Sequence, residues 1–385
     1  MELTLFVDHQ CNLRCSYCYT GEKFSRPMSS ATMGKAVALA LEQGDAELGV
    51  SFFGGEPLLQ VDFLRETIEQ VERAVAALPA PHPGVHFYLN TNGTLIDDEV
   101  IALFAPPRRA AVFVSVDGDR PTHDRFRINR AGKGSYDGVM AGLAKLREAS
   151  IPFEIASVVT TASASELGST IRSLLPLGAA KIHLAANWRD EWTSEAVAAL
   201  AIGLDDASNA WMDWFRAGKQ LPINPLHTKI LTHLKGGMPC PSRCQLGSHE
   251  ICVSPAGRIY PCAQMVGEDT DHGLVIGHVD EGVDDAARQR LQQAKEQVGE
   301  ICQSCELRDR CQSDCGCQQL ALTGRLGQIT EALCELETAF IEAADHVAET
   351  LHTEGCEAFI DFYYKRSWTA AAGGKLTQLR RARDL

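Results

Sequence analysis

The chain has 385 residues, a formal net charge of −14 and 45% hydrophobic residues. A chain of this length can bury more than one hydrophobic core. Its acidic net charge argues against a general nucleic-acid binder. The sequence contains no run of about 18 apolar residues, so no membrane span is expected. Fourteen cysteines without a secretion signal favour metal binding over disulfides, so we expect a cytoplasmic protein.

Short apolar runs alternate with amphipathic stretches over the first half of the chain. Strands are predicted at 3–7, 48–53, 85–90, 111–116, 153–159 and 181–186, and helices at 30–44, 64–75, near 97, at 135–149 and from 163. Six such repeats indicate an α/β fold with a parallel sheet covered by helices, either a partial barrel or a doubly wound open sheet. In both folds, binding sites lie at the carboxyl ends of the strands.

The pattern changes in the second half of the chain. A helix is predicted over 194–215, and the stretch from Cys240 to Cys334 consists of short segments broken by glycines. Most of the cysteines fall there, which predicts metal ligation in place of a large apolar core. A long helix follows, up to about Glu354. The predicted divisions are 1–220 for the α/β part, 221–237 for a bridging segment, 238–340 for a cysteine-rich domain and 341–385 for a C-terminal helix and tail.

Three cysteines follow the first predicted strand, with three and then two residues between them: Cys11, Cys15 and Cys18. They are one short of the four that hold a [4Fe-4S] cluster, which would leave one iron open to another ligand. This spacing, followed by Tyr19, resembles the signature of the radical S-adenosylmethionine (SAM) enzymes.

The resemblance implies a partial (β/α)6 barrel in which the three cysteines hold three irons. The amino and carboxylate groups of SAM would bind the fourth iron. A single electron would then cleave SAM to give a 5'-deoxyadenosyl radical, which abstracts hydrogen from the substrate.

A second motif follows the second predicted strand: Gly54, Gly55, Glu56 and Pro57. Glycines let the backbone approach a ligand closely. Beside the cysteine motif, this segment resembles the one that contacts the amino end of SAM in the same family, and Glu56 is the expected partner of the ammonium group.

Further SAM contacts are implied after the third and fourth predicted strands. The run Ser115-Val-Asp117-Gly118, followed by His123-Asp124 and Arg127, resembles one in the peptide- and protein-modifying branch. There the serine and the arginine contact SAM, so these roles are assigned to Ser115 and Arg127, and Asn92 is expected to reach the same pocket. The alternative for Arg127 is a surface ion pair with Asp124.

The second half carries a longer cysteine pattern that resembles the seven-cysteine pattern of the SPASM domain, which holds two auxiliary [4Fe-4S] clusters. By that resemblance, the distal cluster takes Cys302, Cys305, Cys311 and Cys334. The proximal cluster takes Cys244, Cys262 and Cys315, with Cys240 as fourth ligand. The expected cofactors are therefore SAM and three [4Fe-4S] clusters.

Several alternatives remain open at this point. Cys317 competes with Cys315 as a ligand, and without Cys240 the proximal cluster would have an open iron. A zinc site is the alternative for Cys302 and Cys305. Cys252 is expected in an apolar core, and Cys356 is left over.

The predicted function is that of a radical SAM/SPASM maturase that cross-links a ribosomal precursor peptide through a carbon–carbon or thioether bond. A low-potential electron donor of the flavodoxin or ferredoxin type is the expected partner. Ala263 stands where sulfatase maturases carry a catalytic aspartate, which disfavours that reaction. The chain starts at the first strand, so we expect no N-terminal leader-binding module. The alternatives are a small-molecule oxidase or epimerase, and a non-enzymatic iron–sulfur or zinc scaffold.

Overall fold

The computed structural model describes residues 1–234, 244, 246–270, 273–365, 369–372 and 375–378. They form two compact units that are interleaved along the chain. The first unit comprises Met1–Ser115, His123–Glu154 and Gln245–Gln293, and the second comprises Val116–Thr122, Ile155–Cys244 and Ala294–Leu385. The domain boundaries expected at 220, 237 and 340 stay predictions. Within the described part of the chain, no helix has the length and apolar character that crossing a membrane requires.

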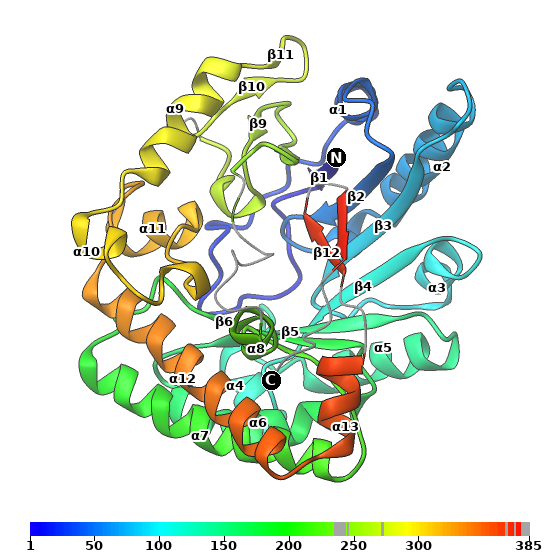
Figure 1. Ribbon diagram of the computed structural model, residues 1–385. Coiled ribbons are helices and arrows are strands. Elements are labelled where there is room, and N and C mark those ends of the chain that lie inside the picture. Colours follow the sequence, from blue (N-terminus) through cyan, green and yellow to red (C-terminus); the bar gives the residue numbers. More distant parts are fainter. Residues whose placement is uncertain (235–243, 245, 271–272, 366–368, 373–374, 379–385) are drawn as a thin grey trace. The chain divides into compact units, whose positions relative to one another are not determined.

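The first unit is built on a largely parallel sheet with the strand order β9-β8-β1-β2-β3-β4. Only the β8–β9 pair is antiparallel among the described pairs of this sheet. Figure 1 shows β2, β3 and β4 side by side, with α2 and α3 along their outer side. The strands are β1 (Glu2–Phe6), β2 (Glu47–Phe53), β3 (Gly84–Thr91), β4 (Ala110–Ser115), β8 (Glu250–Val253) and β9 (Ile259–Tyr260), with a separate pair β10 (Gly277–His278) and β11 (Gly282–Val283).

Two helices of this part begin at capping side chains. Ser29 accepts a hydrogen bond from the backbone amide of Thr32 at 3.1 Å, and Asp97 accepts one from Val100 at 3.0 Å. The helices are α1 (Ser30–Glu42), η1 (Pro57–Gln60), α2 (Val61–Ala76), α3 (Asp98–Phe104), α5 (Tyr136–Glu148) and η4 (Ala263–Met265); α4 (Arg120–Phe126) and α9 (Asp285–Glu296) each have residues in both units.

The second unit combines strands in the order β5-β6-β7 with a layer of helices. Helix α12 packs against α7 and α8, and Figure 1 shows α7 and α12 running side by side. The elements are β5 (Phe153–Val159), β6 (Lys181–Ala186), β7 (Ile223–Asn224), η2 (Ala164–Glu166), α6 (Leu167–Leu174), η3 (Leu175–Leu177), α7 (Ser194–Arg216), α8 (Leu226–Leu234), α10 (Glu300–Gln303), η5 (Arg308–Arg310), α11 (Gly316–Thr323), α12 (Glu331–Thr353), α13 (Glu357–Ile360), a π-helical turn (Asp361–Lys365), β12 (Thr369–Ala372) and β13 (Lys375–Gln378).

The predicted α/β class is confirmed, and all six predicted strands are present within one residue of their expected ends. Trp211 is fully buried in α7, as expected for a packing residue. The aromatic residues near the C-terminus also pack inward, because Phe359 lies 5.6 Å and Phe362 lies 5.8 Å from the ring of Phe215. Strand β8 was not expected to pair with β1. Its Cys252 is fully buried, in agreement with the expected core position.

Candidate metal centres

The loop after β1 carries the first three cysteines and is anchored by a buried carboxylate. Asp8 is 1% exposed. Its Oδ1 accepts hydrogen bonds from the backbone amides of Gln10 at 3.2 Å and Arg26 at 2.8 Å, and its Oδ2 accepts one from Gln60 Nε2 at 3.0 Å. Three hydrogen bonds of Asp8 therefore fix the start of the loop, on the N-terminal side of Cys11.

Cys11 is the most buried of the three thiols. Its side chain is buried, and its Sγ accepts a hydrogen bond from the backbone amide of Leu13 at 3.3 Å. Burial, together with the nearby carboxylate of Glu56, raises the pKa of Cys11 to about 11. A cation or metal at this position would favour the thiolate that ligation requires.

Cys18 is treated differently by the fold. Burial raises the pKa of its thiol, but hydrogen bonds from Lys23 and Thr20 outweigh burial and lower the pKa overall. Lys23 Nζ lies 3.0 Å from Cys18 Sγ, and Thr20 Oγ1 lies 3.3 Å from it. The ammonium group of Lys23 therefore stabilises a thiolate at Cys18.

The middle of the loop is fixed by the segment that follows α4. The backbone amide of Arg14 donates to Ile128 O at 2.6 Å, and that of Ser16 donates to Phe126 O at 3.1 Å. Cys15, between these two bonds, is half-buried, and its carbonyl accepts a hydrogen bond from the amide of Cys18 at 3.2 Å. The three cysteines are thus presented by one loop with a defined backbone, and this set of thiols fits the ligands of an iron–sulfur cluster.

The glycine motif after β2 lies directly against the start of this loop. The amide of Gly55 donates to Asp8 O at 2.8 Å, and the amide of Glu56 donates to Gln10 O at 2.9 Å. A Cβ atom at Gly54 would lie 2.5 Å from Asp8 O, and one at Gly55 would lie 2.2 Å from Gln10 O. Both positions therefore require glycine, because the two backbones touch.

Glu56 is 1% exposed and fully engaged in the interior. Its Oε1 accepts hydrogen bonds from Thr91 Oγ1 at 2.7 Å and the amide of Leu58 at 3.0 Å, and its Oε2 accepts one from the amide of Asn92 at 2.8 Å. Burial nevertheless raises the pKa of Glu56 to about 7. This carboxylate joins the motif after β2 to the end of β3, and its role toward the amino group of SAM stays a prediction. Pro57 is buried at the start of η1.

Asn92 lies beside Cys11 within a closed polar ring. Its Nδ2 lies 3.8 Å from Cys11 Sγ and donates to Asn12 Oδ1 at 2.8 Å. Asn12 Nδ2 donates to Thr94 Oγ1 at 2.9 Å, and Thr94 Oγ1 donates to Asn92 Oδ1 at 2.6 Å. The sequence predicted a site role for Asn92 and none for Asn12, although Asn12 follows a predicted ligand directly.

The remaining predicted SAM contacts lie at the end of β4 and after α4. Ser115 is the last residue of β4 and is half-buried. Arg127 is only 6% exposed, and its guanidinium lies 5.3 Å from the ring centre of Tyr17 in the cysteine loop. The alternative of a surface position for Arg127 is therefore wrong, because the side chain is buried. His123 is fully buried, and its Nε2 lies 2.9 Å from Ser135 Oγ.

An open cavity of about 390 Å³ lies in the first unit over the cysteine loop. Its lining joins the predicted ligand Cys11 to Leu59 in η1 and to residues 129–131 after α4. The lining residues are Gln10, Cys11, Asn12, Leu59, Asn129, Arg130 and Ala131. A pocket of this size suits a small ligand placed beside Cys11.

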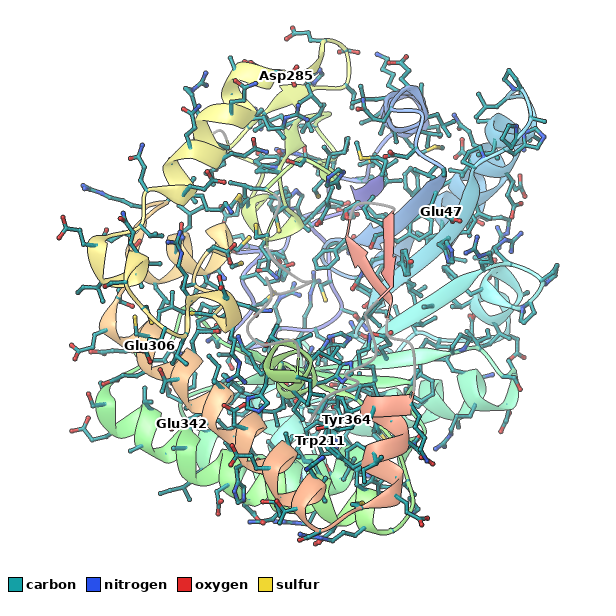
Figure 2. All side chains as sticks on the ribbon, viewed as in Figure 1. Glu47, Trp211, Asp285, Glu306, Glu342 and Tyr364 are labelled. Carbon is teal, nitrogen blue, oxygen red and sulfur yellow. The ribbon has the colours of Figure 1, made fainter. Side chains whose placement is uncertain are left out.

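The second unit gathers four cysteines around one small apolar pocket of about 50 Å³. Cys302, Cys305, Cys311 and Cys334, the residues expected at the distal cluster, all line it. Apolar walls come from Ile301, Leu307 and Ile341. Glu306 and Glu342, next in sequence to pocket residues, point outward from this unit (Figure 2). Four thiols facing one apolar pocket fit the ligand set of a [4Fe-4S] cluster.

Two of the predicted proximal ligands, Cys244 and Cys315, lie together in the second unit. Cys315 accepts hydrogen bonds from Cys244 and Cys317, which lower its pKa well below the ordinary value. The thiols of Cys244, Cys315 and Cys317 therefore lie together in the second unit. Cys317, the alternative to Cys315 as a ligand, is one of them. Cys262 belongs to the first unit, as the residue before η4, and Cys240 lies outside the described residues.

A buried lysine supports this second group of sulfurs. Lys295 is 5% exposed, and its Nζ donates to Cys244 O at 3.0 Å and lies 4.0 Å from Asp314 Oδ2. No disulfide joins any two of the thirteen cysteines in the described ranges. Nor do three His, Cys, Asp or Glu side chains there form a site for a single metal ion.

Comparisons with known proteins agree with this geometry. Residues 7–172 match the model of the radical SAM superfamily, whose members bind SAM and a [4Fe-4S] cluster. The chain is 24% identical to the PqqA peptide cyclase of Gluconobacter oxydans over 344 residues, which is 87% of this chain and 90% of the cyclase. It is 31% identical to a cysteine-type anaerobic sulfatase-maturating enzyme of Clostridium novyi over 157 residues, or 39% of this chain and 41% of that enzyme.

Other curated relatives are matched over part of their length. The chain spans 60% of an uncharacterized protein of Methanocaldococcus jannaschii and 47% of an AdoMet-dependent heme synthase of Methanosarcina barkeri. Among solved structures, native anSMEcpe with bound AdoMet has a TM-score of 0.75 at 19% identity, covering 91% of this chain and 99% of that chain. SuiB of Streptococcus suis bound to precursor peptide SuiA has a TM-score of 0.60 at 15% identity, covering 86% and 75%.

These matches confirm the fold expected from the cysteine and glycine motifs. Residues 7–172 therefore form a radical SAM domain, and the chain is similar to the sulfatase-maturating enzymes and to the PqqA peptide cyclase.

Proposed function

We propose that this chain is a maturase that cross-links a ribosomal precursor peptide through a carbon–carbon or thioether bond. When bound at Cys11, Cys15 and Cys18, a [4Fe-4S] cluster with SAM supplies a 5'-deoxyadenosyl radical that abstracts hydrogen from the peptide. The main support is the match to the PqqA peptide cyclase, which extends over 90% of that enzyme and so includes both halves of the chain.

The chain's own residues prepare the first site for this chemistry. The side chains of Asp8 and Glu56 accept hydrogen bonds from backbone amides of the cysteine loop, of η1 and of the residue after β3, and so anchor the loop beside the glycine motif. Lys23 favours the thiolate form of Cys18, which is the form that binds iron. The cavity beside Cys11 and Asn12 offers room for SAM.

The second unit supports the choice of an oxidative cross-link. Closing such a bond removes two hydrogens from the peptide, so the reaction requires an electron acceptor besides the first site. The four thiols around one apolar pocket provide ligands for an acceptor of the iron–sulfur type. In this proposal the chain carries three [4Fe-4S] clusters, and a flavodoxin or ferredoxin supplies the first electron.

Sulfatase maturation is the second candidate, favoured by the fold match to anSMEcpe. Against it stands Ala263, which follows Cys262 directly and is buried at the start of η4. A methyl group cannot act as a base, so this position lacks the aspartate expected of that reaction.

Mass spectrometry of a co-expressed precursor tests the proposal. The substrate would be the short peptide encoded beside this chain, and the variant C11A/C15A/C18A is the control. We expect the peptide to lose two hydrogens only with the native chain. Incorporation of deuterium at Cα from deuterated water, without loss of mass beforehand, would instead indicate epimerisation. An unmodified peptide from cells in which the chain forms 5'-deoxyadenosine would point to another substrate.

A further inference from the structure

A lysine and a glutamate form a fully buried ion pair next to the four-cysteine pocket. Lys229 Nζ in α8 lies 2.7 Å from Glu337 Oε2 in α12, and the two side chains are 0% and 4% exposed. Removing two charges from water costs several kcal/mol, which their attraction does not always offset. A buried pair of this kind is therefore weak evidence for stability and invites another explanation.

Each partner makes one further bond, and both bonds are made to the backbone around Cys311. Lys229 Nζ donates to Arg310 O at 2.5 Å. Glu337 Oε2 accepts from the amide of Gln312 at 2.8 Å. The first bond holds the peptide group before Cys311, and the second holds the peptide group after it. The ion pair thus clamps the cysteine from both sides.

The surrounding charges strengthen this clamp. Arg310 NH1 lies 2.7 Å from Asp345 Oδ2, its NH2 also pairs with Asp345, and NH2 donates to Lys229 O at 3.1 Å. Asp345 lies two turns beyond Glu337 on α12. This helix therefore supplies both the carboxylate that pairs with Lys229 and the carboxylate that pairs with Arg310. Three separate segments, α8, η5 and α12, are locked together at Cys311.

The clamp also faces the pocket itself. Glu337 lines the same pocket as Cys302, Cys305, Cys311 and Cys334. Cys334 and Glu337 are three residues apart on α12, on one face of the helix. Cys311 Sγ further accepts a hydrogen bond from the amide of Ser313 at 3.3 Å. The carboxylate therefore lies where it would act on both the direction of one thiol and the charge around the pocket.

We propose that Lys229 and Glu337 are positioning residues for an iron–sulfur cluster at this pocket, a role that rests on the auxiliary cluster of the proposed function. The pair fixes the two peptide groups that flank Cys311 and so directs its thiolate into the pocket. Glu337 lines the pocket and Lys229 does not, so the carboxylate is the charge of the pair next to the cluster and lowers the cluster's reduction potential.

The test uses the full chain with C11A/C15A/C18A, so that only auxiliary iron remains, about eight per chain if two cubes are filled. Replacing both partners, in K229M/E337L, removes the clamp without leaving a lone charge. Because apolar substitution of a buried ion pair is often neutral or stabilising, the variant is expected to keep its thermal midpoint. We expect its iron to fall to about four per chain.

A variant of the same shape covers the case in which K229M/E337L does not fold. E337Q keeps an oxygen that accepts from Gln312 and leaves the Lys229 ammonium bonded to Arg310 O, but it removes the negative charge. We expect it to retain its iron, to lose one cluster to a chelator about tenfold faster, and to show a raised midpoint potential in an electron paramagnetic resonance titration. A residue that only supports the fold would not move this potential.

The matched control is R216M/E354L, an ion pair of the same unit between α7 and the end of α12. Glu354 lies 17 residues beyond Glu337, about 25 Å along the helix, and this variant should keep its iron, chelation rate and potential. Iron in the C11A/C15A/C18A chain that is unchanged in K229M/E337L, with an unchanged potential in E337Q, would overturn the inference alone. A C11A/C15A/C18A chain without auxiliary iron would overturn the three-cluster proposal together with this inference.

Discussion

The cysteine loop of the first unit and the four-cysteine pocket of the second unit hold their thiols in place in two different ways. In the loop, three thiols lie within eight residues, and backbone contacts to the glycine motif hold them. In the pocket, the thiols are spread along the chain from Cys302 to Cys334, and the buried ion pair of Lys229 and Glu337 holds the backbone on both sides of Cys311. The first arrangement is local and visible in the spacing, whereas the second exists only after helices have packed.

The largest effect should come from removing a ligand of the loop. C18A is expected to abolish formation of 5'-deoxyadenosine, because two thiols cannot hold the cluster with an open iron. The matched control is C252A, which removes a buried cysteine of β8 that serves as core. High-performance liquid chromatography of the reduced protein with SAM measures the product. Formation of 5'-deoxyadenosine by C18A at the level of C252A would contradict this prediction, because the cysteine loop would then not be the reactive site.

The next effect separates two neighbouring sulfurs of the second unit. Cys315 accepts hydrogen bonds from Cys244 and Cys317 and has the lowered pKa, so it is the better thiolate ligand. C315A should lose about four irons per chain, whereas C317A should lose none. Iron analysis after anaerobic reconstitution decides the matter, and the reverse order would assign the ligand role to Cys317.

A stability effect follows from Glu56, which braces the loop. Its pKa is about 7 in the folded chain against 4.5 for an ordinary glutamate, so the folded state binds its proton more tightly. The stabilisation from this proton is complete below about pH 4.5 and is lost as the pH rises through 7. Between about pH 5 and 7.5 we expect the free energy of unfolding to fall by about 2 kcal/mol relative to E56Q.

Urea denaturation of the native chain and of E56Q, each at both pH values, measures this difference. The E56Q variant carries no titrating group at this position, so it subtracts the contribution of all other groups. Parallel changes of stability with pH in the two proteins would show that Glu56 does not titrate in this range.

The smallest of these effects concerns the donor to a loop thiolate. In K23M, Cys18 loses the ammonium group 3.0 Å from its sulfur, and its pKa should rise. We expect the loop cluster to be lost to a chelator about tenfold faster. K35M, which removes an exposed lysine paired with Asp280, serves as the control and should behave like the native chain. Equal rates of cluster loss in K23M and K35M would show that Lys23 does not stabilise the loop cluster.

Local pattern was enough to predict the first region. The six strands followed from apolar runs of the right length. The two glycines were expected to let the backbone approach a ligand, and the structure places them against the backbone of the cysteine loop. Asn12 was missed because its role depends on Asn92 and Thr94, about eighty residues away, and no short-range signal marks such a ring.

The second region was predicted only at the level of its cysteines. The resemblance of their pattern to the SPASM domain implied four shared ligands, and the structure brings those four to one pocket. Lys229 and Glu337 could not be found from sequence, because a lysine and a glutamate 108 positions apart look like ordinary surface residues. Likewise, the pairing of β8 with β1 depends on a long return of the chain to the first sheet.

Iron analysis of the full chain carrying C11A/C15A/C18A tests most directly whether the two regions are separate centres. The account predicts about eight irons per chain after anaerobic reconstitution, compared with about twelve in the native chain. A value near zero in the variant, with about four in the native chain, would contradict it, because the second region would then hold no cluster of its own.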